Sequence, residues 1–333
     1  MTGAVISGGI AFLVAGSLVP LLVRFAVGRN LLDVPNTRSS HDVPTPRLGG
    51  VAVISATWLG AIFFGLEGAW PLLLAATAVG IVGLADDFLD LHFGVKAAAQ
   101  MASAAALLFL YPPELLSEAP ILLAPFVFLV GGLWVSAVCN AYNFMDGIDG
   151  ITGGVALVGG LFLFALAGDS GAFLPAFVGA VAGFLVWNVN PASIFMGDAG
   201  SYFVGFALAA VAFYAPVGGA WSPLAFFACV LVFAPYLFDT AFTIFRRLRG
   251  GVGRNIFSAH REHIYQRITP ETSMHRRTSN LYYGLAVVSG FAAMLASRGG
   301  VFLVYGVSLA VVCCVFMFVL PRIVRTGKAD ETG

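Results

Sequence analysis

Long apolar runs without polar alternation are the feature of this sequence that most limits how it can fold. A helix needs about 20 apolar residues to cross the hydrocarbon of a membrane, and only helices and closed barrels satisfy their backbone there. Runs of this length recur along the whole chain and lack the two-residue alternation of barrel strands. The sequence therefore predicts an all-α polytopic membrane protein.

Composition excludes the other broad classes. Of the 333 residues, 59% are hydrophobic and only 10% are charged, whereas roughly 25% are charged in an ordinary soluble domain. A soluble fold would expose large apolar patches, and a disordered chain would need more polar residues. The 17 basic residues equal the 17 acidic ones, so we expect no nucleic-acid partner. The four cysteines show no metal-ligand spacing and are expected to be packing residues.

We predict a bundle of about eleven transmembrane helices. The spans are expected at residues 4–27, 48–66, 70–85, 95–111, 119–138, 151–168, 171–188, 201–217, 221–245, 279–297 and 300–320. The gaps at 66–70 and 298–300 are short enough for tight helical hairpins. No fixed repeat or long linker divides the chain, so residues 1–333 are predicted to form one integral-membrane domain.

The basic residues predict an orientation for this bundle. The first charge is Arg24, near the far end of the first span, which argues against a cleaved signal peptide and points the N-terminus outward. Eleven spans then leave 16 of the 17 basic residues on the inner side and only Arg298 outside. Because basic residues favour the cytoplasmic side, the C-terminus is predicted to be cytoplasmic.

Polar clusters follow the odd-numbered spans, so all of them are expected at the cytoplasmic face. Asp86 and Asp87 follow the third span, with Asp90 four residues beyond Asp86. If the helix continued through them, Asp86 and Asp90 would share a face. Adjacent carboxylates favour a bound metal–diphosphate or a general base. A solvated acidic loop is the simpler alternative.

The segment after the fifth span is a stronger candidate. Asn140, Asn143, Asp146 and Asp149 recur at intervals of three, which would place them on one side of a helical turn. The glycines between the acids let a ligand approach the backbone. An N-cap for the sixth span would explain Asp149 but not the other three.

Two further segments complete the polar face. The turn at 190–201 contains Asp198 as its one acid and Phe195 as a ring for stacking, which favours a hard cation, although an N-cap is again the alternative. The inner loop at 246–277 mixes eight arginines with histidines. Such a loop usually reflects topology, but Arg261 and His263 could also clamp a diphosphate.

Together these motifs resemble the polyprenyl-phosphate N-acetylhexosamine-1-phosphate transferase family (glycosyltransferase 4 type), which includes WecA, TagO and MraY. The matching segments, in the family's order, are DVPNTRSSHDVPTPRLGG (33–50), GLADDFLDL (83–91), NAYNFMDGIDGITGG (140–154), NPASIFMGDAGS (190–201) and PYLFDTAFTIFRRLRG (235–250). They cover about residues 33–268.

The resemblance implies a membrane enzyme with two substrates. It would transfer N-acetylhexosamine-1-phosphate from a UDP-N-acetylhexosamine to undecaprenyl phosphate and release UMP, as the first membrane step of cell-envelope polysaccharide synthesis. It implies Mg²⁺ as cofactor, with Mn²⁺ as a substitute, an inner-membrane location and a cytoplasmic active site. A homodimer is compatible with it.

The resemblance also implies roles for individual residues. It assigns the metal to Asp198 and Asn143, and metal contact or deprotonation of the lipid phosphate to Asp86 and Asp87. The carboxylate of Asp149 would read uracil. The remaining implied substrate contacts are Asn140, Asp146, Phe195, Arg261 and His263.

One motif departs from the family's usual pattern. The histidine motif, usually like HIHHRL, here reads His263-Ile-Tyr265-Gln266-Arg267-Ile268. This favours the WbpL-like branch that starts O-antigen chains over an MraY-type phospho-N-acetylmuramoyl-pentapeptide transferase, which remains an alternative. A UbiA-type prenyltransferase would need a second Asp-rich motif where FMGDAGS stands. A transporter would place acids at mid-span.

Overall fold

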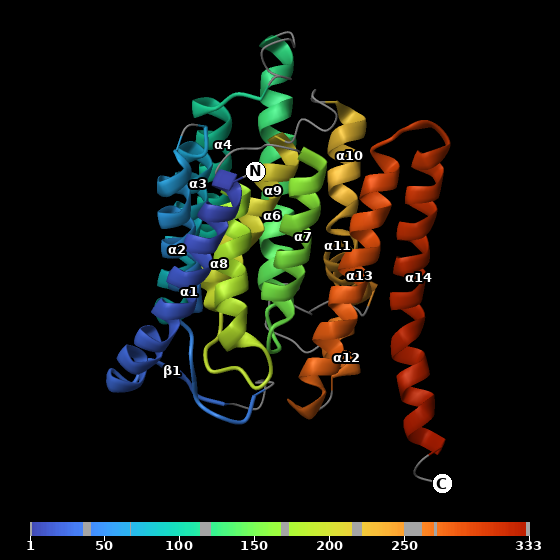
Figure 1. Cartoon of the computed structure of the whole chain (residues 1–333). Helices are drawn as coiled ribbons and strands as arrows, with labels where there is room; N and C mark the ends of the chain where they lie inside the picture. The colour runs from blue at the N-terminus through green and yellow to red at the C-terminus, as the bar shows by residue number, and fades with distance from the viewer. Residues whose placement is uncertain are drawn as a thin grey trace.

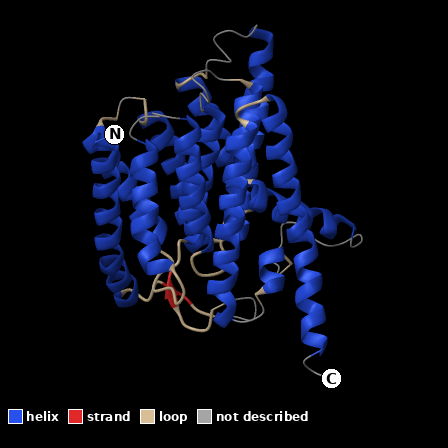
Figure 2. Cartoon of the chain, turned by 45° about the vertical axis from the view of Figure 1, so that its right-hand side comes forward, coloured by secondary structure: helices blue, strands red, loops and turns tan. Residues whose placement is uncertain are grey.

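The structure, a computed structural model, describes residues 2–35, 41–66, 68–113, 121–167, 173–214, 222–249, 262–269 and 272–330. Long helices run side by side in a single bundle, with loops and a short β-ladder gathered at its lower end in Figures 1 and 2. The first helix begins toward the upper end, and the last helix ends beyond the lower one (Figure 1).

Helices form in all of the predicted apolar segments. Their bounds are α1 Thr2–Gly28, α2 Gly49–Phe64, α3 Trp70–Leu89, α4 Phe93–Leu110, α6 Ala124–Met145, α7 Ile151–Ala167, α8 Phe173–Asn188, α9 Gly197–Tyr214, α10 Pro223–Leu231, α11 Ala234–Arg249, α13 His275–Ala296 and α14 Gly300–Asp330. The short helix α12, Ile264–Ile268, lies between α11 and α13. One 3-10 turn, Ile121–Leu123, precedes α6, and another, Thr272–Met274, precedes α13.

Within the described residues, six helices are long and apolar enough to cross a membrane. The count is seven if α10 and α11, which bend by 77° at their junction, form one span. The helices α2, α7 and α8 are apolar but shorter. The chain is therefore a multi-pass helical membrane protein, while eleven crossings and their orientation stay predictions.

Small residues set the close approach of the first helix to the bundle. A Cβ atom at Gly179 or Gly183 of α8 would collide with the backbone of Gly8 or Phe12 of α1. Helices in lipid gain little from apolar burial alone, so close backbone contact between small residues contributes much of their association. The outer faces carry exposed apolar side chains such as Leu133 and Phe109, which suit contact with lipid.

The helix α9 forms the centre of the bundle. Nearly every residue from Gly197 to Phe213 is buried, and α9 packs against α2, α3, α6 and α7. Its N-terminus lies at the lower, loop-bearing end, so Asp198 in its first turn is brought beside the ends of α3 and α6.

Backbone hydrogen bonds join two distant motifs at this end. The strands β1 (Leu32–Asp33) and β2 (Thr45–Pro46) form an antiparallel pair that the sequence did not predict. The amide nitrogen of Phe195 donates to the carbonyl of Pro46 at 2.8 Å, and Gly49 donates back to the Phe195 carbonyl at 2.9 Å. The segment before α2 and the turn before α9 thus form one layer beneath the bundle.

The cysteines behave as expected from their apolar surroundings. All four are free, and Cys139, Cys229 and Cys313 are buried.

Candidate functional site

The acids of α3 meet the first turn of α9. The carboxylate of Asp87 accepts the backbone N–H of Asp198 at 3.0 Å and that of Ala199 at 3.3 Å. These groups belong to the helix N-terminus, which attracts negative charge. A Cβ atom at Gly83 would collide with the Asp198 carbonyl, so glycine permits this approach. The N-terminus of α9 is therefore capped by a residue 111 positions away.

Asp86, the neighbouring residue of α3, is also held in place by hydrogen bonds. Its Oδ1 accepts the Leu91 amide at 2.7 Å, and its Oδ2 pairs with Lys96 Nζ at 2.7 Å. The carboxyl groups of Asp86 and Asp198 lie next to one another. The helix ends at Leu89, and Asp90 adopts a left-handed conformation with φ of 49°. The expectation that Asp86 and Asp90 share a helical face is wrong, because α3 ends before Asp90.

The amides of α6 point to different partners. Asn143 Nδ2 donates to Asp198 Oδ1 at 2.8 Å and to Ser201 Oγ at 3.0 Å. Asn140 Nδ2 instead donates to Gln100 Oε1 at 2.9 Å. Because α6 ends at Met145, Asp146 and Asp149 do not continue a helical face with the asparagines. The predicted single helical side for all four residues is wrong.

Beyond α6 the chain turns through the two remaining acids of the motif. Burial raises the pKa of Asp146 to about 7. Burial also acts to raise the pKa of Asp149, but hydrogen bonds from His275 and Asn190 outweigh it and lower that pKa. These two carboxyls, three residues apart, therefore differ in their charge near neutral pH.

Asp149 ties the turn before α9 to α13. Its Oδ2 accepts Asn190 Nδ2 at 2.8 Å and the Ala192 amide at 3.1 Å, while Oδ1 lies 3.4 Å from His275 Nδ1. Its backbone carbonyl accepts the Ser279 hydroxyl at 2.7 Å. The carboxylate thus binds the 190–192 segment, and not the N-terminus of α7 as the capping alternative required.

Phe195 lies in the layer beneath the bundle. Its ring meets that of His41 edge to face, with centroids 4.9 Å apart. In the chain, Phe195 lies between the 190–192 segment that binds Asp149 and Asp198 at the start of α9.

His263 is buried next to Phe144, with ring centroids 6.1 Å apart. Its Nδ1 lies 3.0 Å from the carboxylate of Asp239. His263 therefore reaches the end of α6 beside Asn143. Arg261, the other predicted diphosphate contact of this loop, lies outside the described residues.

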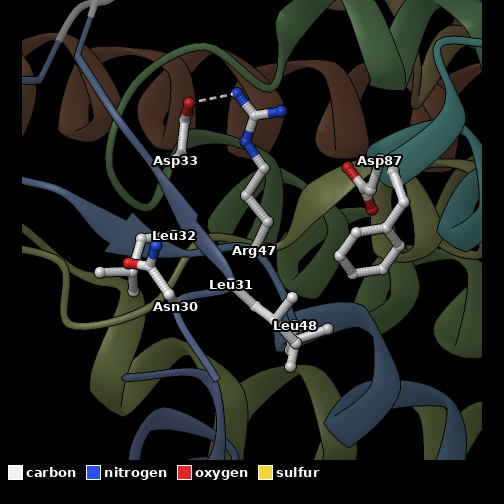
Figure 3. Close-up of a pocket in the computed structure, with 8 residues that line it drawn as sticks. Asn30, Leu31, Leu32, Asp33, Arg47, Leu48 and Asp87 are labelled. Atoms are coloured by element: carbon white, nitrogen blue, oxygen red, sulfur yellow. Dashed lines mark ion pairs between the residues drawn. The ribbon is translucent and has the colours of Figure 1, made fainter. Parts of the chain in front are cut away.

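Two cavities open beside these residues. The larger, about 550 Å³, is lined by Asp90, Leu91, His92, Phe93, Lys96, Asn140, Asn143, Phe144 and Tyr202. The smaller, about 190 Å³, has Asp87 on one wall and the ion pair of Asp33 and Arg47 on another, as Figure 3 shows. The polar residues at the ends of α3 and α6 thus border space that substrates can enter.

Oxygen ligands for a divalent cation are available next to Asn143 and Asp87, which line these cavities. Mg²⁺ is usually held by one or two carboxylates together with waters and substrate phosphates. Among the described residues, no three His, Cys, Asp or Glu side chains are arranged to hold a metal by themselves. Asp198, with the carboxyl of Asp86 beside it and the Asn143 side chain in contact, provides an open set of oxygen donors. The residues fit Mg²⁺ bound together with a diphosphate.

Three residues of this region were given no functional role from the sequence. They are Lys96, which pairs with Asp86; Arg47, which borders the smaller cavity; and Asp239, which holds His263. Lys96 had a usable signal, because it is one of only two lysines in the chain and follows the acidic pair closely. The partners of Arg47 and Asp239 are set by the tertiary fold.

Comparison with known proteins agrees with this architecture. Residues 69–215 match the family model described as Glycosyl transferase family 4. The decaprenyl-phosphate N-acetylglucosaminephosphotransferase of Mycobacterium tuberculosis is 33% identical over 308 residues, covering 78% of this chain and 74% of that protein. The probable undecaprenyl-phosphate N-acetylglucosaminyl 1-phosphate transferase of Bacillus subtilis is 25% identical over 330 residues, covering 94% and 89%.

A third relative is named for the transfer of a different sugar phosphate. The phospho-N-acetylmuramoyl-pentapeptide-transferase of Bacillus anthracis is 32% identical over 248 residues, covering 63% of this chain and 74% of that protein. These matches place the chain among membrane-embedded phosphosugar transferases. It belongs to glycosyl transferase family 4, which confirms the resemblance drawn from the five motifs.

Proposed function

We propose that this protein transfers N-acetylhexosamine-1-phosphate from a UDP-sugar to undecaprenyl phosphate and releases UMP. The observation that carries the proposal is the meeting of Asp86, Asp87, Asn143 and Asp198 at one end of an apolar bundle. The names of the B. subtilis and M. tuberculosis relatives support it, because both describe transfer of an N-acetylglucosamine phosphate group with a polyprenyl phosphate.

The reaction exchanges one phosphoanhydride bond for another. A phosphate oxygen of the lipid attacks the sugar-side phosphorus of the UDP-sugar, forming a new P–O bond. The bond from that phosphorus to the bridging oxygen breaks, and its electron pair leaves with UMP. Such transfers depend mainly on positioning and on neutralisation of charge.

The chain's residues divide these tasks in our proposal. Asp198 and Asn143 would hold the cation beside the diphosphate, and Asp86 and Asp87 would contact the metal or remove a proton from the lipid phosphate. Mg²⁺, with Mn²⁺ as a substitute, supplies positive charge that stabilises the diphosphate and the leaving UMP. Asn140, Asp146, Arg261 and His263 complete the substrate contacts.

We assign the nucleotide to the layer beneath the bundle. The Phe195 ring would stack on uracil, and the Asp149 carboxylate would accept its N3–H. The turn at 190–201 supports this assignment, because it contains two partners of Asp149, the Phe195 ring and Asp198.

The membrane arrangement of the proposal has eleven crossings, an outer N-terminus and a cytoplasmic C-terminus. The site then faces the cytoplasm of the inner membrane, where a soluble UDP-sugar and a membrane-bound lipid phosphate can meet. The basic residues concentrated on the same side support this orientation. We treat residues 1–333 as one transferase domain, and a homodimer is compatible with it.

Purified protein tests the proposal directly. Incubation with labelled UDP-N-acetylglucosamine, undecaprenyl phosphate and Mg²⁺ should move label into the lipid fraction with one UMP released per transfer. A panel of UDP-N-acetylhexosamines identifies the sugar. If UDP-N-acetylmuramoyl-pentapeptide is the only donor that is used, the protein is a phospho-N-acetylmuramoyl-pentapeptide transferase instead. If no donor yields UMP, the proposal is refuted.

A periplasm-active reporter fused after Lys328 tests the topology separately. It should be silent, and reporter activity there would contradict the odd number of crossings or their direction.

A further inference from the structure

Asp239 is an acid that the proposed chemistry does not use. It lies in α11, just beyond the 77° bend that separates this helix from α10, and its side chain is 0% exposed. Burying a carboxylate is costly unless hydrogen bonds replace its water. The hydrogen-bond donors around Asp239 therefore indicate its structural role.

Donors from three helical regions surround this carboxylate. Its Oδ1 is contacted by His263 Nδ1 at 3.0 Å, the Ile264 amide at 2.9 Å and Thr243 Oγ1 at 3.3 Å, and its Oδ2 by the Tyr265 amide at 3.1 Å and Tyr282 Oη at 2.6 Å. A carboxylate accepts hydrogen bonds and does not donate them, so Asp239 is the acceptor in all of these contacts. Asp239 thus fixes both the ring of His263 and the first turn of α12.

The anchored α12 in turn contacts the end of α6. Tyr265 Oη donates to the Phe144 carbonyl at 3.2 Å, and a Cβ atom at Gly147 would collide with the Tyr265 ring. The His263 ring also packs against the Phe144 ring. Phe144 lines the larger cavity and directly follows Asn143 in the chain. A chain of contacts therefore runs from Asp239 to the residue beside the Asp198–Asn143 pair.

We propose that Asp239 is a positioning residue of the transfer site, which it serves by anchoring α12 and His263 against the Asn143–Phe144 segment. The proposal rests on the proposed function, because positioning has a meaning only relative to a reaction. Asp239 itself touches neither substrate nor metal. Its two carboxylate oxygens accept hydrogen bonds from donors of α12 and α13 at the same time.

The first test compares Asp239→Asn with Thr240→Val. Thr240 is the next residue of the same helix, is also buried, and its hydroxyl has no hydrogen-bond partner within the described residues. The amide of Asn would direct N–H groups at donors of α12. A misplaced site commonly loses about 100-fold, so we expect kcat for UMP release to fall roughly 10- to 100-fold in Asp239→Asn. Thr240→Val should stay within about twofold, because it removes a hydroxyl that has no hydrogen-bond partner within the described residues and nearly keeps the shape of the side chain.

A double-mutant cycle with His263→Ala separates positioning from an independent contribution. Because coupled residues are not additive, Asp239→Asn should cost less than about threefold further in the His263→Ala background. Full multiplication of the two losses, or wild-type kcat in Asp239→Asn, would overturn the proposal.

Two further measurements keep the proposal testable if Asp239→Asn does not fold. Tyr265→Phe keeps the ring but removes the link to Phe144, and it should lower kcat about three- to tenfold with the donor KM nearly unchanged; wild-type kcat in this variant would contradict the contact chain. Hydrogen exchange should be slow at the Ile264 and Tyr265 amides of the wild type. Fast exchange there refutes the anchor, whereas absence of UMP release by the wild type refutes only the proposed function.

Discussion

Two buried acidic centres in this protein differ in what surrounds them. Asp239 is enclosed by hydrogen-bond donors from α11, α12 and α13. Asp198 is enclosed by acids, with the carboxyl of Asp86 beside it and that of Asp87 bound to its own backbone, and only Asn143 donates to its side chain among the hydrogen bonds described above.

The difference indicates two uses of a carboxylate. A buried carboxylate whose acceptor sites are filled by the protein stabilises the fold at that point. Clustered carboxylates repel one another unless a cation joins them. We therefore interpret the Asp239 centre as an anchor and the Asp198 centre as a place for positive charge that arrives with the substrate.

Removal of divalent metal should have the largest effect, and it should act on the Asp198 centre and not on the Asp239 centre. Excess EDTA should abolish UMP release, and Mg²⁺ should restore it, because the clustered carboxylates would lose the cation that links them to the diphosphate. Hydrogen exchange at Ile264 and Tyr265, which report on the Asp239 centre, should not change. Full activity in EDTA would remove the distinction between the two centres.

Substitution of Asp198 should reduce activity next most strongly. Asp198→Asn should lower kcat roughly 100- to 1,000-fold, the loss seen when a charge-stabilising group is removed from a reaction centre. Its thermal midpoint should stay the same or rise, since one of several crowded carboxylates becomes neutral. Ser201→Ala, which removes another partner of Asn143, is the control for altered packing alone. Native kcat in Asp198→Asn at ordinary Mg²⁺ would exclude it as the principal ligand.

Substitution of Asp149 tests whether one carboxylate can both hold the 190–192 loop and bind the nucleotide. Loss of a hydrogen bond to a charged group costs about 1.5–3 kcal/mol, roughly one to two decades in affinity. Asp149→Ala should weaken UMP binding by that factor and leave undecaprenyl-phosphate binding nearly unchanged, as measured by calorimetry. Asn190→Ala is the matched control, because it frees the same loop but keeps the carboxylate. Equal losses in both variants would show that Asp149 only holds the loop.

The smallest expected effect is at the rim of the Asp239 centre. Tyr282→Phe removes one short hydrogen bond of 2.6 Å and leaves the other donors in place. It should destabilise the protein by about 1.5 kcal/mol, the low end for a hydrogen bond to a charged group. The lowered thermal midpoint should come with kcat near that of the wild type. A midpoint unchanged by Tyr282→Phe would mean that the Asp239 centre does not stabilise the fold.

The apolar segments and the family motifs could be read from the sequence. Each membrane segment must form its backbone hydrogen bonds within itself, so length and composition alone locate the helices. For example, α7 covers Ile151–Ala167, and the predicted span was 151–168. The motif residues Asp87, Asn143, Phe195 and Asp198 were also identified from local patterns, and the fold brings them to one end of the bundle.

Only the tertiary structure decided which partner each of these side chains has. Asp87 caps a helix 111 positions away, and Asn140 and Asn143 of one helix face Gln100 and Asp198 respectively. The anchor at Asp239 depends on α12 and α13 folding back onto α11. The physical reason is that helix formation in a membrane is a local requirement of about 20 residues, whereas the hydrogen bonds of a buried carboxylate depend on whichever helices pack around it.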